Sequence, residues 1–350
     1  MHQWASLAAA AALLVNGAVA QFNMLRFACS QLVVDRVDPL VNPGMRYTPH
    51  LHQIVGGNSF NLTMEPVTYD LAKRSTCTSC SFVQDKSNYW TAVMFFKHKN
   101  GSYHRIPQVG NGGPQGRLIN KGGLDVYYIP SGRTTAFKPG FRMLAGNAAE
   151  TDDNKVSRGN ICHRCWTSTN EDQFIGGAPC TGSDTVAIPQ NPSCKMIRQT
   201  IIFPHCWDGR NLDTPDHKSH VAYGQGSGAN GGGACPSSHP VRLPQVMYEL
   251  MWNVTDFTDR SWWPDSGPAF VYSMNLGGSA AHGDYVFGWE GDVLQRAMDM
   301  GCNLNRDCPQ AGLTSQPPEK YNACTIKQQA PEPVDGWLKE MPMGQMAIRA

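Results

Sequence analysis

The sequence predicts a mainly β protein: a single-domain, β-sandwich-like core with long disulfide-tied loops and one or two short helices. Glycine (35) and proline (24) together make up about one residue in six, so many residues are committed to turns. The clearest periodic segments are short runs of β-branched and aromatic residues, which favour strands over helices. Twelve cysteines, an even number, can form up to six disulfides that tie the loops together.

Four short runs are the best strand candidates. They cover residues 92–96, 124–129, 198–203 and 245–254; the first two are bounded by Gly, Pro or Asn, and the third stops at Pro204. Every second residue from Val246 to Val254 is apolar, so these residues should share one face, with residues such as Met247 on the other. Segments 224–233 and 275–281 are predicted to be loops.

One helix has a clear start signal. Asp292 can cap it, and Gln295 three residues later completes a capping box. The apolar residues that follow predict a short helix that ends near Gly301.

The amino-terminal end predicts export. An apolar run of about eleven residues begins at Ala5, and Ala18-Val19-Ala20 matches the pattern that signal peptidase cleaves. We therefore predict a signal peptide over residues 1–20. The run is shorter than the roughly twenty apolar residues that a membrane span needs, and no later stretch predicts membrane insertion. The protein should be extracellular and secreted, either released or loosely held at the cell surface.

The rest of the chain is predicted to be one globular domain over residues 21–324, because it shows no internal repeat and no low-complexity linker. Residues 325–350 should form a C-terminal arm on the surface, with Trp337 and Leu338 docked. We expect a monomer. Charged residues are 16% of the chain and the net charge is +1, so there is no basic stripe for nucleic acid.

Two cysteine motifs leave an alternative open. The spacing of Cys77 with Cys80, and of Cys162 with Cys165, would also suit a four-thiolate zinc site. Export favours disulfides, because thiols outside the cell are normally oxidised. Three N-glycosylation sequons begin at Asn61, Asn100 and Asn253, so the exported protein should be a glycoprotein.

Histidine and aspartate are concentrated in three distant segments. The first contains His50 and His52, which would lie on one face of an extended chain about 7 Å apart. The third is His282-Gly283-Asp284. The second is a loop between Pro204 and His220 with the densest cluster of polar groups: His205, Asp208, Arg210, Asp213, Asp216, His217, Lys218 and His220.

These groups suit three kinds of chemistry. Neighbouring His and Asp side chains can act as general base and acid. Two carboxylates across a cleft can hydrolyse a glycosidic bond. Several His and an Asp can bind a divalent metal that polarises a sugar carboxylate or hydroxyl. Structural interpretations compete with all three, because aspartates cap turns, and Trp207 and other aromatic residues commonly lie in a core.

Two enzyme classes are disfavoured. A polysaccharide-cleaving copper monooxygenase needs a histidine at the mature amino terminus, where the predicted residue is Gln21. A serine hydrolase of the Gly-x-Ser-x-Gly type lacks its nucleophile motif.

Several longer strings resemble the DUF1996 family of secreted proteins, which is abundant in filamentous fungi. They are Asp38-Pro39-Leu40-Val41-Asn42-Pro43-Gly44, His50-Leu51-His52-Gln53-Ile54-Val55-Gly56-Gly57, Phe203-Pro204-x-Cys206-Trp207-Asp208-Gly209, Asp216-His217-Lys218-Ser219-His220, Cys235-Pro236-x-x-His239-Pro240 and His282-Gly283-Asp284. The resemblance spans roughly residues 22–302, and no sugar-binding WSC module follows it. It implies a fungal extracellular or cell-wall-associated protein, adds His239 to the candidate site, and carries over no established catalytic role.

The leading expectation is a secreted fungal carbohydrate-active protein, a glycoside hydrolase or polysaccharide lyase acting on a cell-wall or environmental polysaccharide. The expected catalytic residues are His50, His52, Asp208, His217, His220, His282 and Asp284. The expected substrate-binding residues are Trp207, Arg210, Lys218 and His239. A divalent metal is a candidate cofactor. The alternatives are a non-catalytic cell-wall or matrix protein that binds glycan, and a metal-scavenging or redox protein.

Overall fold

The computed structural model describes residues 24–344 except 66–68, 111, 114–115, 118–120, 169–177 and 227–231. The predicted signal peptide, residues 1–20, and the end of the arm, residues 345–350, lie outside the described residues. The described chain is mainly β, as the sequence predicts. No helix in this part of the chain combines the length and the apolar character that crossing a membrane requires.

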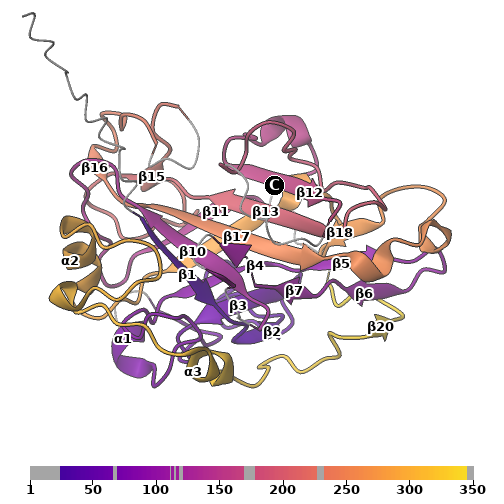
Figure 1. The fold of residues 1–350 in the computed structure, drawn as a ribbon, viewed down its shortest axis with the longest axis horizontal. Helices are drawn as coiled ribbons and strands as arrows, with labels where there is room; N and C mark the ends of the chain where they lie inside the picture. Colours follow the sequence, from indigo (N-terminus) through magenta and orange to yellow (C-terminus); the bar gives the residue numbers. More distant parts are fainter. Residues whose placement is uncertain are drawn as a thin grey trace, which may run out of the picture.

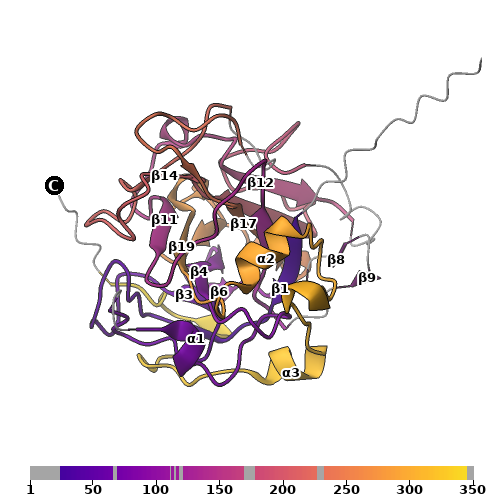
Figure 2. The same ribbon diagram turned by 90° about the vertical axis from the view of Figure 1, so that its left-hand side faces the viewer.

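Two antiparallel sheets form the body of the protein (Figure 1). The first has the order β1 (Leu25–Cys29), β10 (Leu124–Ile129), β17 (Gln245–Asn253), β13 (Met196–Ile202) and β12 (Ile161–Trp166), with β7 (Gln108–Val109) paired to the end of β17. The second has the order β11 (Arg142–Gly146), β19 (His282–Val286), β4 (Asn88–Ala92), β3 (His52–Gly56) and β2 (Val33–Asp35). Seen from the side, β11, β19, β4 and β3 form a separate layer from β12, β17 and β1 (Figure 2).

Smaller elements decorate the ends of this sandwich. One sheet joins β15 (Val221–Ala222), β14 (Cys206–Trp207) and β16 (Val241–Arg242). Another joins β18 (Phe270–Tyr272), β5 (Met94–Lys97), β6 (Tyr103–Arg105) and β20 (Trp337–Leu338), and a hairpin joins β8 (Gly112–Gly113) to β9 (Gly116–Arg117). The helices are α1 (Leu71–Arg74), α2 (Val293–Asp299) and α3 (Pro318–Ala323), with 3-10 turns at Asp153–Lys155, Thr255–Phe257, Arg260–Trp262, Gly278–Ala280 and Pro309–Ala311.

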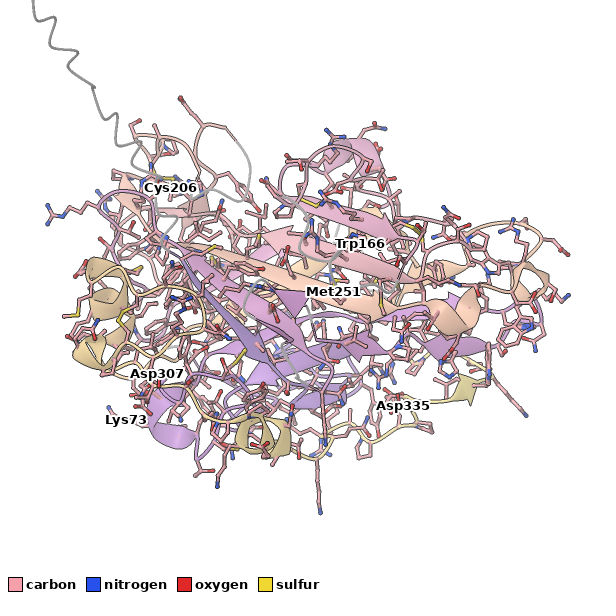
Figure 3. All side chains as sticks on the ribbon, viewed as in Figure 1. Lys73, Trp166, Cys206, Met251, Asp307 and Asp335 are labelled. Carbon is pink, nitrogen blue, oxygen red and sulfur yellow. A yellow bond between two sulfur atoms is a disulfide. The ribbon has the colours of Figure 1, made fainter. Side chains whose placement is uncertain are left out.

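The main core fills the space between the two sheets. The alternation predicted for β17 is confirmed: the inward side chains are Val246, Tyr248, Leu250, Trp252 and Val254. Met247 and Met251 lie on the opposite face, where Met251 packs beside Trp166 (Figure 3). Tyr89 of β4 meets Tyr248 across the interface with ring centroids 5.7 Å apart. Burial of this aromatic and β-branched layer is the main force that joins the sheets.

A second core covers the outer face of the second sheet. It contains Ile54 of β3, Trp90 of β4 and Leu144 of β11, together with residues from segments 32–71 and 324–330. The chain segments that follow β2 and the C-terminal arm therefore act as a cover for this sheet. The first and third histidine segments contribute His52 to β3 and His282 to β19, in the sheet below this cover.

Six disulfides fix the loops, and the described residues contain no free cysteine. The pairs are Cys29–Cys80, Cys77–Cys324, Cys162–Cys180, Cys165–Cys194, Cys206–Cys235 and Cys302–Cys308. Each cysteine of the two Cys-x-x-Cys motifs pairs with a different distant partner. The alternative of a four-thiolate zinc site is therefore wrong.

Three local expectations need correction. The predicted strand over residues 92–96 is split at Val93, where the chain leaves the second sheet and enters another. Helix α2 forms as predicted, but Asp292 accepts no capping hydrogen bond and instead pairs with Arg296. The side chain of Gln295 binds the main chain of residues 134 and 136 and does not close a capping box. Tertiary contacts outcompete the local cap.

Trp337 and Leu338 dock by forming β20 against β6 at the edge of a sheet. Trp337 nevertheless keeps 48% of its surface exposed. This part of the chain leaves an indole ring accessible.

A buried carboxyl group makes stability depend on pH. Asp85 is fully buried, accepts hydrogen bonds from the Tyr89 hydroxyl (2.7 Å) and the Ser87 N–H (3.0 Å), and has its pKa raised by burial to about 6. A carboxyl whose folded pKa is raised stabilises the fold at low pH, and that contribution is lost as pH rises through 6.

We therefore expect Asp85→Asn to weaken the pH dependence of folding. Between pH 4 and pH 7 the wild type should lose up to about 3 kcal/mol of stability relative to this variant, since each pKa unit corresponds to about 1.4 kcal/mol. Urea denaturation at both pH values measures the difference. The exposed Asp265→Asn variant is the control, and a parallel pH dependence for all three proteins would contradict the account.

Candidate functional site

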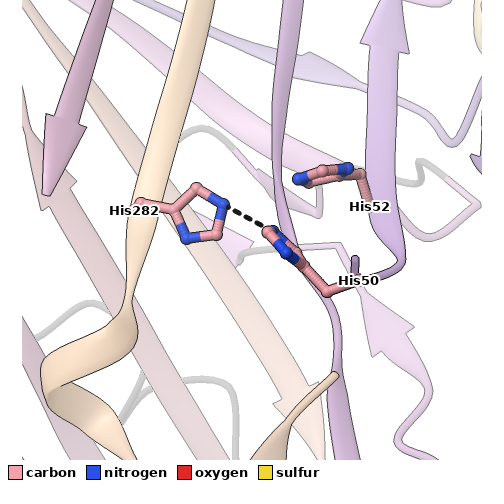
Figure 4. Close-up of side chains that lie close together, drawn as sticks. All are labelled: His50, His52 and His282. Atoms are coloured by element: carbon pink, nitrogen blue, oxygen red, sulfur yellow. Dashed lines mark hydrogen bonds between the residues drawn. The ribbon is translucent and has the colours of Figure 1, made fainter. Parts of the chain in front are cut away.

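Three histidines from two distant segments of the chain meet on the outer face of the second sheet. The ring centroids of His50 and His52 are 4.3 Å apart, those of His50 and His282 are 4.9 Å apart, and those of His52 and His282 are 5.7 Å apart. Figure 4 shows the rings pointing toward one another, with His282 on β19 and the other two at the start of β3. We call this group the histidine triad.

The sheet register explains why the triad forms. His52 pairs with Ala92 of β4, and Gly283 pairs with Thr91, which brings the preceding His282 opposite Ala92 on the other side. The two imidazoles thus flank one small residue on the central strand. His50 lies two residues before His52, just outside β3, and completes the group from the same segment.

Hydrogen bonds to the main chain orient two of the rings. The Nδ1 atom of His52 lies 3.2 Å from the Val37 carbonyl oxygen, and that of His282 lies 3.0 Å from the Ala280 carbonyl oxygen. A carbonyl oxygen only accepts, so both Nδ1 atoms carry the proton and both Nε2 atoms present a lone pair. This arrangement is typical of histidines that bind a metal through Nε2.

Two nitrogens of the triad are not satisfied by the described protein. His50 Nε2–H donates to His282 Nε2 at 3.1 Å, while His50 Nδ1 and His52 Nε2 are buried with no hydrogen-bond partner among the described residues. A buried polar atom without a partner is costly, which suggests that a ligand belongs in this space. One ring nitrogen from each histidine lies within 4.8 Å of the others.

Burial keeps the imidazoles neutral. His50, His52 and His282 are 7%, 0% and 2% exposed. Loss of hydration lowers the pKa of His50 and of His52 well below the usual value and lowers that of His282 to about 4. Neutral imidazoles with free lone pairs are the form that binds a divalent metal.

The spacing suits a small ion with nitrogen ligands. Tetrahedral zinc with Zn–N bonds of about 2.0–2.1 Å places neighbouring nitrogens about 3.3 Å apart. The 3.1 Å separation between His50 and His282 is close to that value. Two other described groups have comparable spacing, but each includes both sulfurs of a disulfide, which cannot bind a metal as thiolates.

Asp284 places a carboxylate beside the triad. It lies two residues after His282 on the same face of β19, and its Oδ2 is 3.8 Å from His282 Nε2. Both carboxylate oxygens are buried without a hydrogen-bond partner among the described residues. Burial raises the pKa of Asp284 well above the usual value, and repulsion from the Asp38 carboxylate adds to this effect while Lys218 opposes it.

Asp38 is a site residue to which the sequence alone assigns no role. It is 3% exposed, and its Oδ1 accepts the N–H groups of Leu40 and Val41, both at 3.0 Å. Burial raises its pKa to about 6, and the nearby His217 lowers it in part. In the sequence it enters only as the first residue of a string that resembles the DUF1996 family.

Part of the second segment reaches the same region through the edge of β11. The Leu144 N–H donates to the His217 carbonyl (2.9 Å), and Leu144 pairs with Asp284 on β19. Lys218 Nζ donates to the Gly146 carbonyl (2.6 Å), and Gly146 pairs with His282. The loop thus brings the side chains of His217 and Lys218 toward the triad, with His217 Nδ1 bound to Asp213 Oδ1 at 2.6 Å.

Other predicted site residues hold the fold. His220 is buried and bridges the Arg142 carbonyl (2.8 Å) and the Thr214 hydroxyl (3.0 Å), which fixes the loop on β11. Asp208 binds the N–H groups of residues 210 and 211, as the turn-forming alternative predicts. Asp216 likewise caps the turn over residues 218–219. These interactions account for all three side chains without chemistry.

Three predicted substrate contacts also lie outside the triad. Trp207 is 3% exposed, donates from Nε1 to the Asn211 carbonyl and lies under the Lys138 ammonium, so no ring face is open for sugar stacking. Arg210 is exposed on the turn beyond it. His239 binds the Ser219 carbonyl (3.0 Å) and so secures the loop from its outer side.

Gly283 separates the two functional residues of its motif for a packing reason. A Cβ atom at this position would lie 2.9 Å from Phe203 Cζ and 3.0 Å from Tyr248 Cε2. The first sheet therefore approaches β19 too closely for any side chain. The same strand presents His282 and Asp284 on its outer face and bare backbone on its inner face.

Comparison with known proteins confirms the family that the sequence motifs resemble. A family model described as a domain of unknown function, DUF1996, matches residues 38–289. The chain belongs to the DUF1996 family. The match begins at Asp38, ends at Trp289, and so contains the whole triad and Asp284. No curated protein and no solved structure matches this DUF1996 chain.

The close approach at Gly283 gives a test. Gly283→Ala should destabilise the protein by about 1–3 kcal/mol, because the added methyl group has to displace two aromatic rings. Gly277→Ala is the matched control, since its Cβ would meet no atom within 4 Å and its φ of −80° suits alanine. Chemical denaturation compares the two. Equal stability of both variants would show that the sheets do not pack as described.

Proposed function

We propose that this protein is an exported carbohydrate-active protein whose reactive centre is a divalent transition metal bound by His50, His52 and His282. The observation that carries the proposal is the convergence of three neutral, buried imidazoles, two of which have a nitrogen without a hydrogen-bond partner among the described residues. Three histidines with one open position are the ligand set of several catalytic zinc sites. The six disulfides support export, because such bonds persist in oxidising compartments.

Asp284 is the chain's candidate for proton transfer at this centre. Burial raises the pKa of Asp284 well above its usual range, and a carboxyl group whose pKa is raised in this way can serve as a general acid or base. It lies on the metal-facing side of His282 and has no competing hydrogen bond among the described residues. A bound metal would supply Lewis acidity toward a sugar hydroxyl or carboxylate.

Lys218 contributes favourable charge to Asp284. In the proposal it orients the carboxylate of an acidic sugar or steadies the ionised form of Asp284. The Asp213–His217 pair extends the polar cluster toward the surface, since the His217 side chain is partly exposed. The surface around His50, the most exposed member of the triad, is the side from which a substrate would approach.

One observation favours the non-catalytic alternative, in which the protein binds glycan in a cell wall or matrix. His52 and His282 are almost completely covered, and a polymer needs an open groove. In that case the triad would hold a structural ion or none. The two functions differ in whether a product forms and in whether Asp284 matters.

The proposal predicts metal-dependent activity on a panel of neutral and acidic polysaccharides. Purified protein should release reducing ends or unsaturated sugars, and chelation or His52→Gln should abolish release. Asp284→Asn should lower the rate by about 100-fold or more, the usual contribution of a proton-transfer group, with the metal retained. Asp265→Asn, an exposed carboxyl, should change the rate less than twofold.

Reducing-end assays and mass spectrometry of the products measure this effect, with thermal unfolding as a check that each variant is folded. Binding of insoluble glycan with no product across the panel would support the matrix alternative. Full activity of Asp284→Asn would remove that residue from the proposed chemistry.

A further inference from the structure

A second candidate binding site lies outside the triad, where β20 closes the sheet formed by β5 and β6. A hollow of about 490 Å³ opens there, lined by His98, Asn100, Ser102, Trp262, Trp337 and Lys339. The lining combines flat aromatic rings with short polar side chains, the composition typical of sugar sites.

The aromatic rings form an open-sided corner. Trp262 and Trp337 have centroids 6.0 Å apart at 72°, and His98 lies 5.4 Å from Trp337 and 5.8 Å from Trp262. The side chain of Trp337 is 48% exposed. Such exposure is unusual for tryptophan, which is highly buried on average. The corner suggests an occupant with one apolar face and polar edges.

The turn between β5 and β6 brings a glycosylation sequon into this hollow. The His98 N–H donates to the Ser102 carbonyl (2.9 Å) and the Gly101 N–H to the His98 carbonyl (2.9 Å). Gly101 has φ of +88°, which glycine adopts readily and which closes a hairpin turn of this length. Asn100, Gly101 and Ser102 therefore form a rigid acceptor sequence at the tip.

The side chain of Asn100 is held by its oxygen only. Its Oδ1 accepts from the Ser102 N–H (2.9 Å) and the Ser102 hydroxyl (2.7 Å), and no hydrogen bond to its Nδ2 occurs among the described residues. The Asn100 N–H donates to His98 Nδ1 (3.0 Å), which fixes the imidazole beside it. The amide nitrogen is thus free for substitution next to three aromatic rings.

From this geometry we infer that Asn100 carries an N-linked glycan whose first sugars fold back into the hollow and stack on His98, Trp262 and Trp337. The inference rests on the export that is part of the proposed function and is independent of the triad. Transfer of the oligosaccharide from a polyprenyl diphosphate carrier joins sugar C1 to Asn100 Nδ2. The C1–O bond to the diphosphate breaks, and Nδ2 loses one proton.

The other two sequons provide a contrast. Asn61 is exposed, and its Oδ1 accepts from its neighbour Leu62 (2.7 Å). Asn253 ends β17 and binds the Thr255 hydroxyl and N–H. Neither side chain lines the hollow that contains Trp262 and Trp337. A glycan on Asn61 should extend into solvent, whereas that on Asn100 should act as a part of the fold.

The test uses full-length protein secreted from a eukaryotic host, with peptide mass spectrometry to locate the glycans. Asn100 should be occupied in most molecules. Trimming to a single N-acetylglucosamine should leave the Tm within about 1 °C, while Asn100→Gln should lower it by about 2–4 °C, a modest loss for a domain of this size. Asn61→Gln is the matched control and should leave the Tm unchanged.

A double variant separates stacking from the mere presence of a sugar. In a Trp337→Ala background, Asn100→Gln should cause a clearly smaller loss of Tm than it does in the wild type, because one of the three rings that the glycan contacts is already absent. Unoccupied Asn100, additive losses in the double variant, or tight binding of added oligosaccharide to the hollow of Asn100→Gln would each overturn the inference. His282→Gln should not change Asn100 occupancy, so failure here is distinct from failure of the triad.

Discussion

The antiparallel register of β3, β4 and β19 is the constraint on which the site depends. It places His52 and His282 on either side of Ala92, and one row further along it places Asp284 and Ile54 on either side of Trp90. The close packing of the first sheet against Gly283 holds β19 in this position. Because strand side chains alternate, a shift by one residue would turn His282 and Asp284 into the main core.

This register places a polar cluster beneath a cover of apolar side chains. Uncharged imidazoles tolerate that setting, but nitrogens and carboxylate oxygens without partners do not. The protein satisfies some of the cluster with carbonyl groups of Val37, Ala280 and Gly146, and leaves His50 Nδ1, His52 Nε2 and the Asp284 carboxyl oxygens without a partner among the described residues. The proposed cation would resolve this imbalance, because it would accept the lone pairs and supply the carboxylate with an opposite charge.

Sequence reasoning predicted the elements with strong local signals, such as β10, β17 and α2, and it selected all three histidines of the triad. Their meeting could not be derived, because His282 is more than two hundred residues from His52 and sheet order is a property of the whole chain. The second segment was assigned too many functional residues for the same reason. Asp208 and Asp216 form turns, the charge of Lys218 acts on His282 and Asp284, and His217 acts on Asp38. Asp38 and Ala92 were missed, since a turn aspartate and a strand alanine give no chemical signal until their neighbours are known.

The most direct test of the central claim is an X-ray absorption spectrum of the intact protein loaded with zinc or cobalt. The account predicts about one equivalent of tightly held metal, with three imidazole nitrogens in its coordination shell at about 2.0–2.1 Å and one nitrogen fewer in His282→Gln. A shell of oxygens alone, a spectrum unchanged by that substitution, or less than a tenth of an equivalent bound would contradict it.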